Sequence, residues 1–331
     1  MRFVICRNFA SDVLSACCLG ILVCSYALPA FSQGTYPSKP VRFIIPFAPG
    51  GYTDILARTL GQRMANTWGQ PFIMDNRPGA TGNTATGMAA RASADGYTIL
   101  MVPSSFAINP GLFKEVPYDA VRDFAPISLV ASSPYILVVH QSVPVQSVRE
   151  LIEYAKAHQG QLNYSSSGSG TATHVAAELF KSMAAVHITH IPYKGTGAQL
   201  TDLLAGQIQM AFGSIGMLPH VKAGRLKALG VSSAKRSSAF PDLPTVAEAG
   251  LPGFDVSSWY GVIAPAGTPK NIVAQLNSEI VRITRLPDVM DGMARSGADS
   301  VGNSPDEFAA FIKTELTRWA KVIKETGASV D

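Results

Sequence analysis

The sequence predicts an α/β protein with two lobes, and three observations lead to this prediction. Apolar segments typical of buried strands alternate with segments of helical periodicity, which favours parallel or mixed sheets with helices on both faces. The chain has 331 residues, which is long for a single hydrophobic core. Two strand–loop–helix stretches of the same character, residues 43–58 and 162–174, lie far apart, so we expect one in each lobe.

The first stretch begins with an apolar run, residues 41–45, that suits a buried strand. A turn rich in Pro and Gly follows, and apolar side chains then recur at helical spacing from Ile55 to Met64. The N–H groups and the dipole at a helix N-terminus attract anions, and glycine lets a ligand approach the backbone. We expect Thr53 or Asp54 to cap this helix. A turn without a ligand is the alternative for any one such stretch.

The second stretch has the same order of strand, small polar loop and helix. Its loop consists of Ser, Gly and Thr, so it offers hydroxyl groups as well as backbone N–H groups. Because the pattern occurs twice, we expect two anion-binding loops, one from each lobe, on either side of a small acid.

The N-terminus predicts a secretory signal peptide over residues 1–32. Arg2 and Arg7 form a basic region, residues 13–28 are mostly apolar, and small residues precede a cleavage point before Gln33. A short core helix is the alternative.

Composition excludes several classes of protein. Apolar residues make up 47% of the chain and charged residues 15%, which is typical of a packed globular protein. Residues 33–331 hold 25 basic and 22 acidic side chains without long basic runs, so we do not expect nucleic-acid binding. All four cysteines precede residue 33, which leaves no disulfide or thiolate metal site in the remainder. Lipidation of Cys17 is an alternative. The region before Cys17 is short and contains Asp12, which disfavours this alternative.

Further strands are predicted at residues 72–74 and 97–102, with a helix between them at residues 84–92. Ser104 and Ser105 follow the second of these strands directly. Ligands in open α/β sheets gather beyond the carboxyl ends of strands, so both serines are candidates for the binding site. Ordinary turn serines are the alternative.

The chain is expected to cross between the lobes twice. Apolar runs at residues 127–130 and 135–139 predict the first crossing, and residues 254–264 predict the return. Trp259 and Tyr260, on the return, either fill the core, which we favour, or line the cleft. The predicted boundaries are a first lobe of residues 33–131 and 256–331 and a second lobe of residues 132–255.

The other predicted elements are helices at 148–157, 270–284 and 305–324 and strands at 188–191, 208–212 and 226–231. Ser147 is expected to cap the first of these helices, and Ser304 with Glu307 predicts a capping box on the last.

No motif indicates catalysis or metal binding. Gly168-Ser169-Gly170 lacks the spacing of a nucleophile elbow. His187 and His190 are three apart on a predicted strand, so their side chains should point to opposite faces. Glu178 and Asp202 are lone helix carboxylates that we expect to be solvated. We therefore expect a protein that is not an enzyme and has no metal and no cofactor.

Two further residues each allow two interpretations. His174, in the first helical turn after the serine loop, either lines the cleft or braces the loop. Lys194 follows an apolar strand and either faces an acid ligand or is a solvated loop lysine.

Short motifs along the chain, in one order, point to a family. They are Tyr36–Val41, Pro46–Arg58, Asp75–Gly79, Asp95–Thr98, Tyr118–Asp119 with Asp123–Pro126, Asn163–His174, Pro192–Gly195, Pro241–Thr245 with Glu248–Gly250, and Ala264–Pro269. With these motifs the chain resembles the Bug receptors, the substrate-binding proteins of tripartite tricarboxylate transporters. The resemblance covers residues 33–331.

The resemblance implies a two-lobed periplasmic binding protein fold, type II-like, with two crossing strands as the hinge. It also implies a small carboxylate between the lobes, held by main-chain groups and ordered waters of the two loops. Carried over to this sequence, the binding residues are Phe47, Gly50, Gly51, Tyr52, Thr53 and Asp54 in the first loop, and Ser166, Ser167, Gly168, Ser169, Gly170 and Thr171, with His174 behind them, in the second. Further candidates are Ser104, Ser105, Lys194 and Ser214.

Two positions depart from the family pattern. Tyr52 is large where similar chains often have a small residue, so it either narrows the pocket or stacks on a flat ligand. Phe212-Gly213-Ser214 stands where many similar chains have an Asp after the Phe. The missing carboxylate argues against an amino acid as the ligand.

The predicted function is that of a periplasmic receptor, a monomer, that delivers a small organic acid to membrane permease subunits. One alternative is a receptor that presents the ligand to a sensor kinase. The other alternative is an enzyme that processes a carboxylate.

Overall fold

The computed structural model describes residues 36–168, 171–193, 196–237 and 240–326. Residues from Lys39 onward form one compact unit, and the fold below is that of this unit. The predicted signal peptide and Lys194 lie outside the described residues, as do Ser169 and Gly170 of the second loop.

The first of two sheets has six strands in the order β11-β4-β10-β3-β1-β2. Its strands are β1 (Val41–Ile45), β2 (Phe72–Asn76), β3 (Thr98–Pro103), β4 (Phe124–Pro134), β10 (Ser257–Pro265) and β11 (Asp299–Ser300). Strand β1 is parallel to β2 and β3, whereas β10 is antiparallel to β3 and β4, so the sheet is mixed. Phe43, Ile44 and Ile45 are fully buried, as expected for a strand with helices on both faces.

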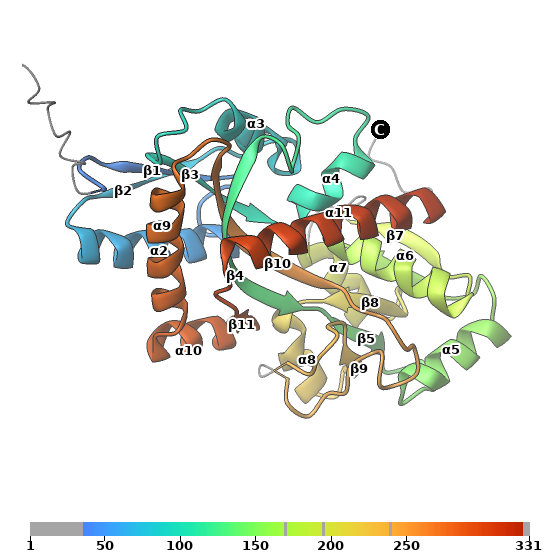
Figure 1. The fold of residues 1–331 in the computed structure, drawn as a ribbon. Coiled ribbons are helices and arrows are strands. Elements are labelled where there is room, and N and C mark those ends of the chain that lie inside the picture. Colours follow the sequence, from blue (N-terminus) through green and yellow to red (C-terminus); the bar gives the residue numbers. More distant parts are fainter. Residues whose placement is uncertain (1–35, 169–170, 194–195, 238–239, 327–331) are drawn as a thin grey trace, which may run out of the picture. The chain divides into compact units, whose positions relative to one another are not determined.

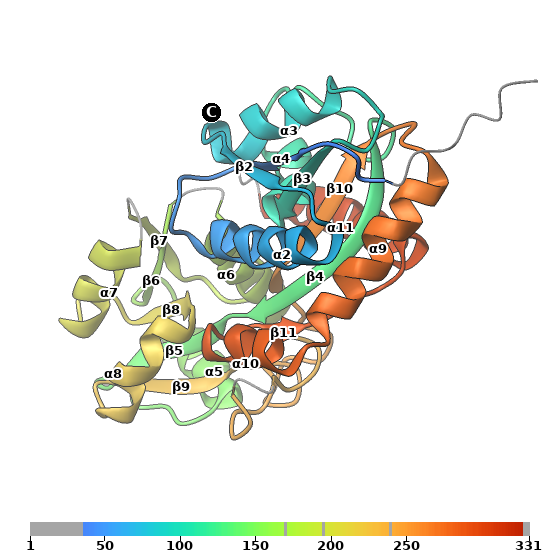
Figure 2. The ribbon, with the colours of Figure 1, turned by 90° about the vertical axis from the view of Figure 1, so that its left-hand side faces the viewer.

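The helices that accompany this sheet are α2 (Tyr52–Trp68), α3 (Asn83–Ala90), α4 (Ser105–Leu112), α9 (Lys270–Thr284), α10 (Pro287–Arg295) and α11 (Pro305–Thr326), with a short 3-10 turn, η2 (Ala80–Gly82). Helix α2 packs against β1, β2 and α9, and α10 lies beside β11 (Figure 2). The loops after β1, β2 and β3 all leave the carboxyl ends of parallel strands. They therefore emerge at the same edge of the sheet.

The second sheet has five strands in the order β7-β6-β8-β5-β9. Its strands are β5 (Ile136–His140), β6 (Asn163–Ser166), β7 (Thr189–Pro192), β8 (Met210–Gly213) and β9 (Leu226–Val231). Strand β6 is parallel to β7 and β8, and β5 runs antiparallel to β8 and β9. The helices here are α5 (Val148–Ala157), α6 (Ala172–Ala184), α7 (Thr196–Leu204) and α8 (Leu218–Lys222), with the turn η3 (Ile215–Met217).

The two sheets are joined closely along the chain. Strand β4 ends at Pro134 in the first sheet and β5 begins at Ile136 in the second, so Tyr135 alone connects them. The chain returns through β10, which pairs with β4 along its whole length. Helix α11 contacts α4 and β4 as well as α6, and it therefore packs on elements that accompany both sheets (Figure 1). The predicted lobe boundaries stay a prediction.

Most predicted elements are confirmed, and so is the α/β class. Ser147 accepts a hydrogen bond from Glu150 N, and Ser304 and Glu307 bond each other as in a capping box. The predicted cap of α2 is wrong. Its N-cap is Gly51, and no side chain caps it, because the helix starts at Tyr52, earlier than the apolar pattern shows.

Other predictions need correction. His187 precedes β7 rather than lying on it. Glu178 is not solvated: its side chain is 14% exposed, accepts a hydrogen bond from the Tyr164 hydroxyl and pairs with Lys181 at 2.7 Å. Helix α10 is not among the predicted elements. Among the described residues, no helix is both long and apolar enough to cross a bilayer.

Candidate functional site

A cavity of about 450 Å³ lies where loops from both sheets meet. From the first sheet its wall includes residues that follow β1, β2 and β3, together with part of β10. From the second sheet it includes the loop after β6, the start of α7 and the end of β8. Seven of the predicted site residues are on this wall: Phe47, Thr53, Ser104, Ser105, Ser167, Thr171 and Ser214.

The first loop places Phe47 and Thr53 on the wall, while Gly50, Gly51, Tyr52 and Asp54 lie off it. Gly50 has a φ of +89°, a conformation that favours glycine. Gly51 has a φ of −75°, and a Cβ added there would meet only Ala48 O, at 3.9 Å. The first glycine is therefore needed for the turn, and the second leaves open space in front of the helix N-terminus.

Asp54 holds the first loop in place from behind. One carboxylate oxygen accepts hydrogen bonds from Gly50 N at 2.9 Å and Arg58 Nε at 2.8 Å, and the other accepts from Asn76 Nδ2 at 2.9 Å. The Asn76 amide also donates to Phe47 O. Burial alone would raise the pKa of Asp54, but these hydrogen bonds outweigh it and lower the pKa to about 2. Asp54 is thus charged and fully engaged, so its role is to shape the loop.

The second loop places Ser167 and Thr171 on the wall, with Ala172 and Thr173 at the start of α6. Thr171 caps α6 and also donates to Gly168 O at 2.7 Å. Gly168 has a φ of +146°, and a Cβ there would lie 3.4 Å from Tyr193 O. Ser166 and Gly168 themselves lie behind the wall. The loop therefore presents hydroxyl groups and a helix N-terminus to the cavity.

His174 lies behind the second loop, in a stack of rings. Its ring lies 4.2 Å from that of His190, which lies 4.7 Å from that of Tyr164. His190 Nε2 is 2.7 Å from Ser166 Oγ. Burial lowers the pKa of both histidines, that of His190 to about 4 with a contribution from His174. Of the two interpretations for His174, the geometry favours bracing of the loop.

The floor of the cavity carries the hydroxyl groups of Tyr135, Ser258 and Tyr260. Ser258 Oγ donates to the Tyr260 hydroxyl at 3.2 Å, and burial raises the pKa of both tyrosines. These residues belong to the two connections between the sheets. The sequence favours a core position for both Trp259 and Tyr260. Trp259 is 1% exposed and lies in the core, whereas Tyr260 lines the cavity.

Tyr52 does not lie on the described wall of the cavity. Its ring meets that of Tyr260, a wall residue, edge to face, with centroids 5.0 Å apart. Among the described residues, its buried hydroxyl has no hydrogen-bond partner. Burial raises the pKa of Tyr52, and the neighbouring Tyr260 and Asp299 add to the effect. Tyr52 therefore supports a wall residue from behind.

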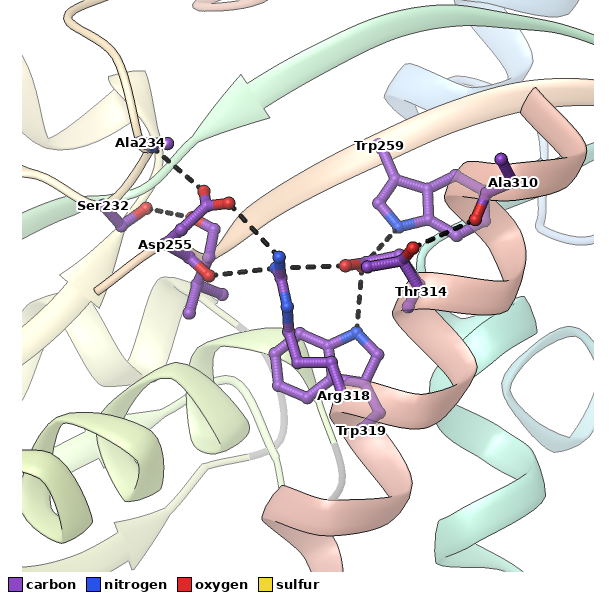
Figure 3. Close-up of polar contacts among 10 residues, drawn as sticks. Ser232, Ala234, Asp255, Trp259, Ala310, Thr314, Arg318 and Trp319 are labelled. Carbon is purple, nitrogen blue, oxygen red and sulfur yellow. Dashed lines mark hydrogen bonds and ion pairs between the residues drawn. The ribbon is translucent and has the colours of Figure 1, made fainter. Parts of the chain in front are cut away.

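Behind the floor, a buried carboxylate joins β10 to α11 (Figure 3). Glu315 Oε2 accepts hydrogen bonds from the indole nitrogens of Trp259 and Trp319, at 2.9 and 3.0 Å. Arg318 pairs with Glu315 and also donates to Asp255 O, just before β10. This network fixes the strand that carries Ser258 and Tyr260.

The described wall carries no charged side chain. It combines hydroxyl and amide groups with apolar side chains, which are Phe47, Pro103, Ile108, Ala172, Leu200, Phe212 and Met217. Within the described residues there is also no cluster of three or more His, Cys, Asp or Glu side chains that could hold a metal ion. Such a wall can hold an anion through N–H and O–H donors, with apolar contacts for its carbon skeleton.

Sequence reasoning missed several wall residues, notably Thr81, Tyr135, Thr196, Gln199 and Ser258. Thr81 and Thr196 both follow the carboxyl end of a strand. The rule that selected Ser104 and Ser105 would also have found these two. No such signal in the sequence marks the other three. Gln199 reaches the wall from helix α7, while Tyr135 and Ser258 reach it from the two connections between the sheets.

Comparison with known proteins adds independent support. Residues 56–328 match the family model described as tripartite tricarboxylate transporter family receptor. Three solved structures are similar over their whole length. Rpa4515 of R. palustris with adipate is 37% identical over 89% of this chain, with a TM-score of 0.76. The periplasmic binding protein BugD is 34% identical over 89% of this chain, with a TM-score of 0.72. MatC of Rhodopseudomonas palustris with bound malate is 32% identical over 87%, with a TM-score of 0.70.

These likenesses extend across both sheets, and they confirm the two-lobed fold of a solute-binding protein. The family consists of receptors rather than enzymes. The chain belongs to the receptor family of tripartite tricarboxylate transporters.

Proposed function

We propose that this protein is a periplasmic receptor that binds a small organic carboxylate in the cavity and delivers it to a tripartite tricarboxylate-type membrane transporter. The observation that carries the proposal is the chemistry of the wall. Loops from both sheets converge on one cavity, and its described polar groups are hydroxyls, amides and helix N-termini rather than charged side chains.

Such a wall suits a carboxylate for a physical reason. N–H and O–H donors form strong, charge-assisted hydrogen bonds to carboxylate oxygens. Helices α2 and α6 both begin at the cavity, and their N-termini favour negative charge. Two relatives of known structure were solved with adipate and malate, which are small dicarboxylates.

Family membership favours delivery to a transporter over presentation to a sensor kinase. The periplasmic location is supported by the signal-like residues 1–32 and by the periplasmic relative BugD. We also propose that the receptor acts as a monomer. Cell fractionation and light scattering of the purified protein would test location and oligomeric state.

The function is tested by a thermal-shift screen of the purified protein against adipate, malate, citrate, benzoate and aspartate. A ligand at a hundred times its Kd adds about 2.7 kcal/mol to the free energy of unfolding, which raises Tm by several degrees. We expect at least one of the non-amino acids to do so. A screen in which sugars or cations raise Tm and no acid does would contradict the proposal.

A Gly51→Val variant tests the role of the first loop. The backbone at Gly51 accepts a side chain and the space in front of it is open, so the variant is expected to melt like the wild type. A side chain there would block approach to the helix N-terminus, and we expect at least a tenfold weaker acid affinity. A folded variant that binds the acid unchanged would remove this loop from the site.

A further inference from the structure

The short turn Gly79–Gly82, after β2, has an unusual backbone. All four residues have positive φ, with values of 143°, 44°, 53° and 96° along the chain. Two of the four, Ala80 and Thr81, are not glycine. A side chain in this region is strained, because its Cβ crowds the backbone.

Neighbouring elements hold the turn in place through hydrogen bonds and close contacts. Thr81 O accepts hydrogen bonds from Ser105 Oγ and Asn109 Nδ2, both at 3.1 Å. The same Asn109 amide donates to Asn83 Oδ1 at 2.7 Å. A Cβ placed on Gly82 would lie 3.3 Å from Pro46 Cβ and 3.8 Å from Ser105 Oγ. The turn is therefore wedged between the end of β1 and the start of α4, beside two predicted parts of the site.

Thr81 is the member of this turn that lies on the cavity wall. Its carbonyl is engaged, but within the described residues its hydroxyl makes no hydrogen bond. Ser105, its neighbour on the wall, already directs its own hydroxyl to Thr81 O. Thr81 thus offers a donor at the edge of the cavity, next to the first loop, on a backbone that Ser105 and Asn109 hold by hydrogen bonds.

We propose that Thr81 is a specificity-determining ligand contact whose hydroxyl donates a hydrogen bond to a carboxylate oxygen of the bound acid. This inference rests on the proposed function and extends it to a third loop. On the side of the first sheet, the ligand would then contact the loops after β1, β2 and β3, and not only those after β1 and β3.

The strain at Thr81 makes the proposal testable, because stability and binding should change in different ways. Thr81→Gly removes the strained Cβ, so the Tm without ligand should equal or exceed that of the wild type. The same change removes the hydroxyl, so the Kd should rise about tenfold, the effect of one hydrogen bond to a charged group. Thr81→Ala should weaken binding equally, and Thr81→Ser should stay within about twofold of the wild type.

Ala80→Gly is the matched control. It removes the same kind of strain one residue away, but Ala80 is not on the wall, so Tm should respond and Kd should not. The measurements are Tm by calorimetry without ligand, and Kd for adipate and malate by titration calorimetry, using the purified protein.

Several outcomes would overturn the proposal. Wild-type affinity in Thr81→Gly and Thr81→Ala would show that the hydroxyl is not used. A Thr81→Gly variant that melts well below the wild type would assign the side chain a structural role. If neither acid binds the wild type, the proposed function fails for these acids and the inference fails with it. Failure of the proposed function is distinguishable from failure of the Thr81 inference alone, because it is seen with the wild-type protein, without any variant.

Discussion

Trp259 Nε1 donates to Glu315 Oε2 at 2.9 Å, and this bond joins strand β10, which carries Ser258 and Tyr260 of the cavity floor, to helix α11 (Figure 3). Glu315 is 2% exposed, and Trp319 donates to the same oxygen. A carboxylate this buried needs its partners, because an unpaired buried charge is strongly destabilising.

Glu315→Gln is expected to lower the free energy of unfolding by about 2 kcal/mol, since the two indole hydrogen bonds lose their charged acceptor and Arg318 keeps, among the described residues, only Asp255 as a carboxylate partner. Urea unfolding, followed by tryptophan fluorescence, measures the loss. Glu325→Gln, on the exposed end of the same helix, should change stability by less than about 0.5 kcal/mol. Equal effects of the two variants would contradict a structural role for the buried network.

Asp54→Asn is expected to destabilise the protein at neutral pH by about 2 kcal/mol. The pKa of Asp54 is lowered in the folded state to about 2, so the charged form stabilises the fold. That contribution is complete above the ordinary aspartate pKa and is lost as pH falls through about 2. The stability difference between variant and wild type should therefore shrink below pH 4. Exposed Asp242→Asn is the control, and a difference independent of pH would refute the linkage.

His190 should make the protein less stable in mild acid. Burial and the neighbouring His174 and Lys181 lower its pKa to about 4, while Glu178 opposes them. The unfolded chain then binds more protons than the folded one between about pH 6.5 and pH 4, so stability falls as pH drops through this window. The effect is on the order of 2 kcal/mol. His190→Gln should flatten the dependence of Tm on pH, whereas exposed His187→Gln should leave its slope unchanged.

Gly50→Ala and Gly51→Ala should behave differently although the residues are adjacent. Gly50 has a positive φ, so Ala there should cost about 1 kcal/mol. Gly51 has an ordinary backbone and room for a methyl group, so its variant should be as stable as the wild type. Chemical denaturation measures both. A destabilised Gly51→Ala together with a neutral Gly50→Ala would show that the turn differs from the one described.

The fold and part of the site could be predicted because they depend on local pattern. Strands and helices follow from the period of apolar residues, and the capping box at Ser304 and Glu307 depends on two residues in one turn. The loop positions Thr53, Ser104 and Ser167 follow from where strands end. Asp54 and Tyr52 were also named from the sequence, but their support of the site from behind was not foreseen.

The sequence by itself determined an α/β chain with two polar loops at helix N-termini, since apolar periodicity and loop composition are local properties. Tertiary structure decided which of those residues face the cavity. Tyr52 packs against Tyr260, which is more than two hundred positions away, and Asp54 of helix α2 accepts a hydrogen bond from Asn76 of strand β2. Such contacts form only when distant segments pack together, because burial and hydrogen bonding depend on neighbours in space. Thr81 shows the same effect, since Asn109, far along the chain, helps to hold it at the cavity edge.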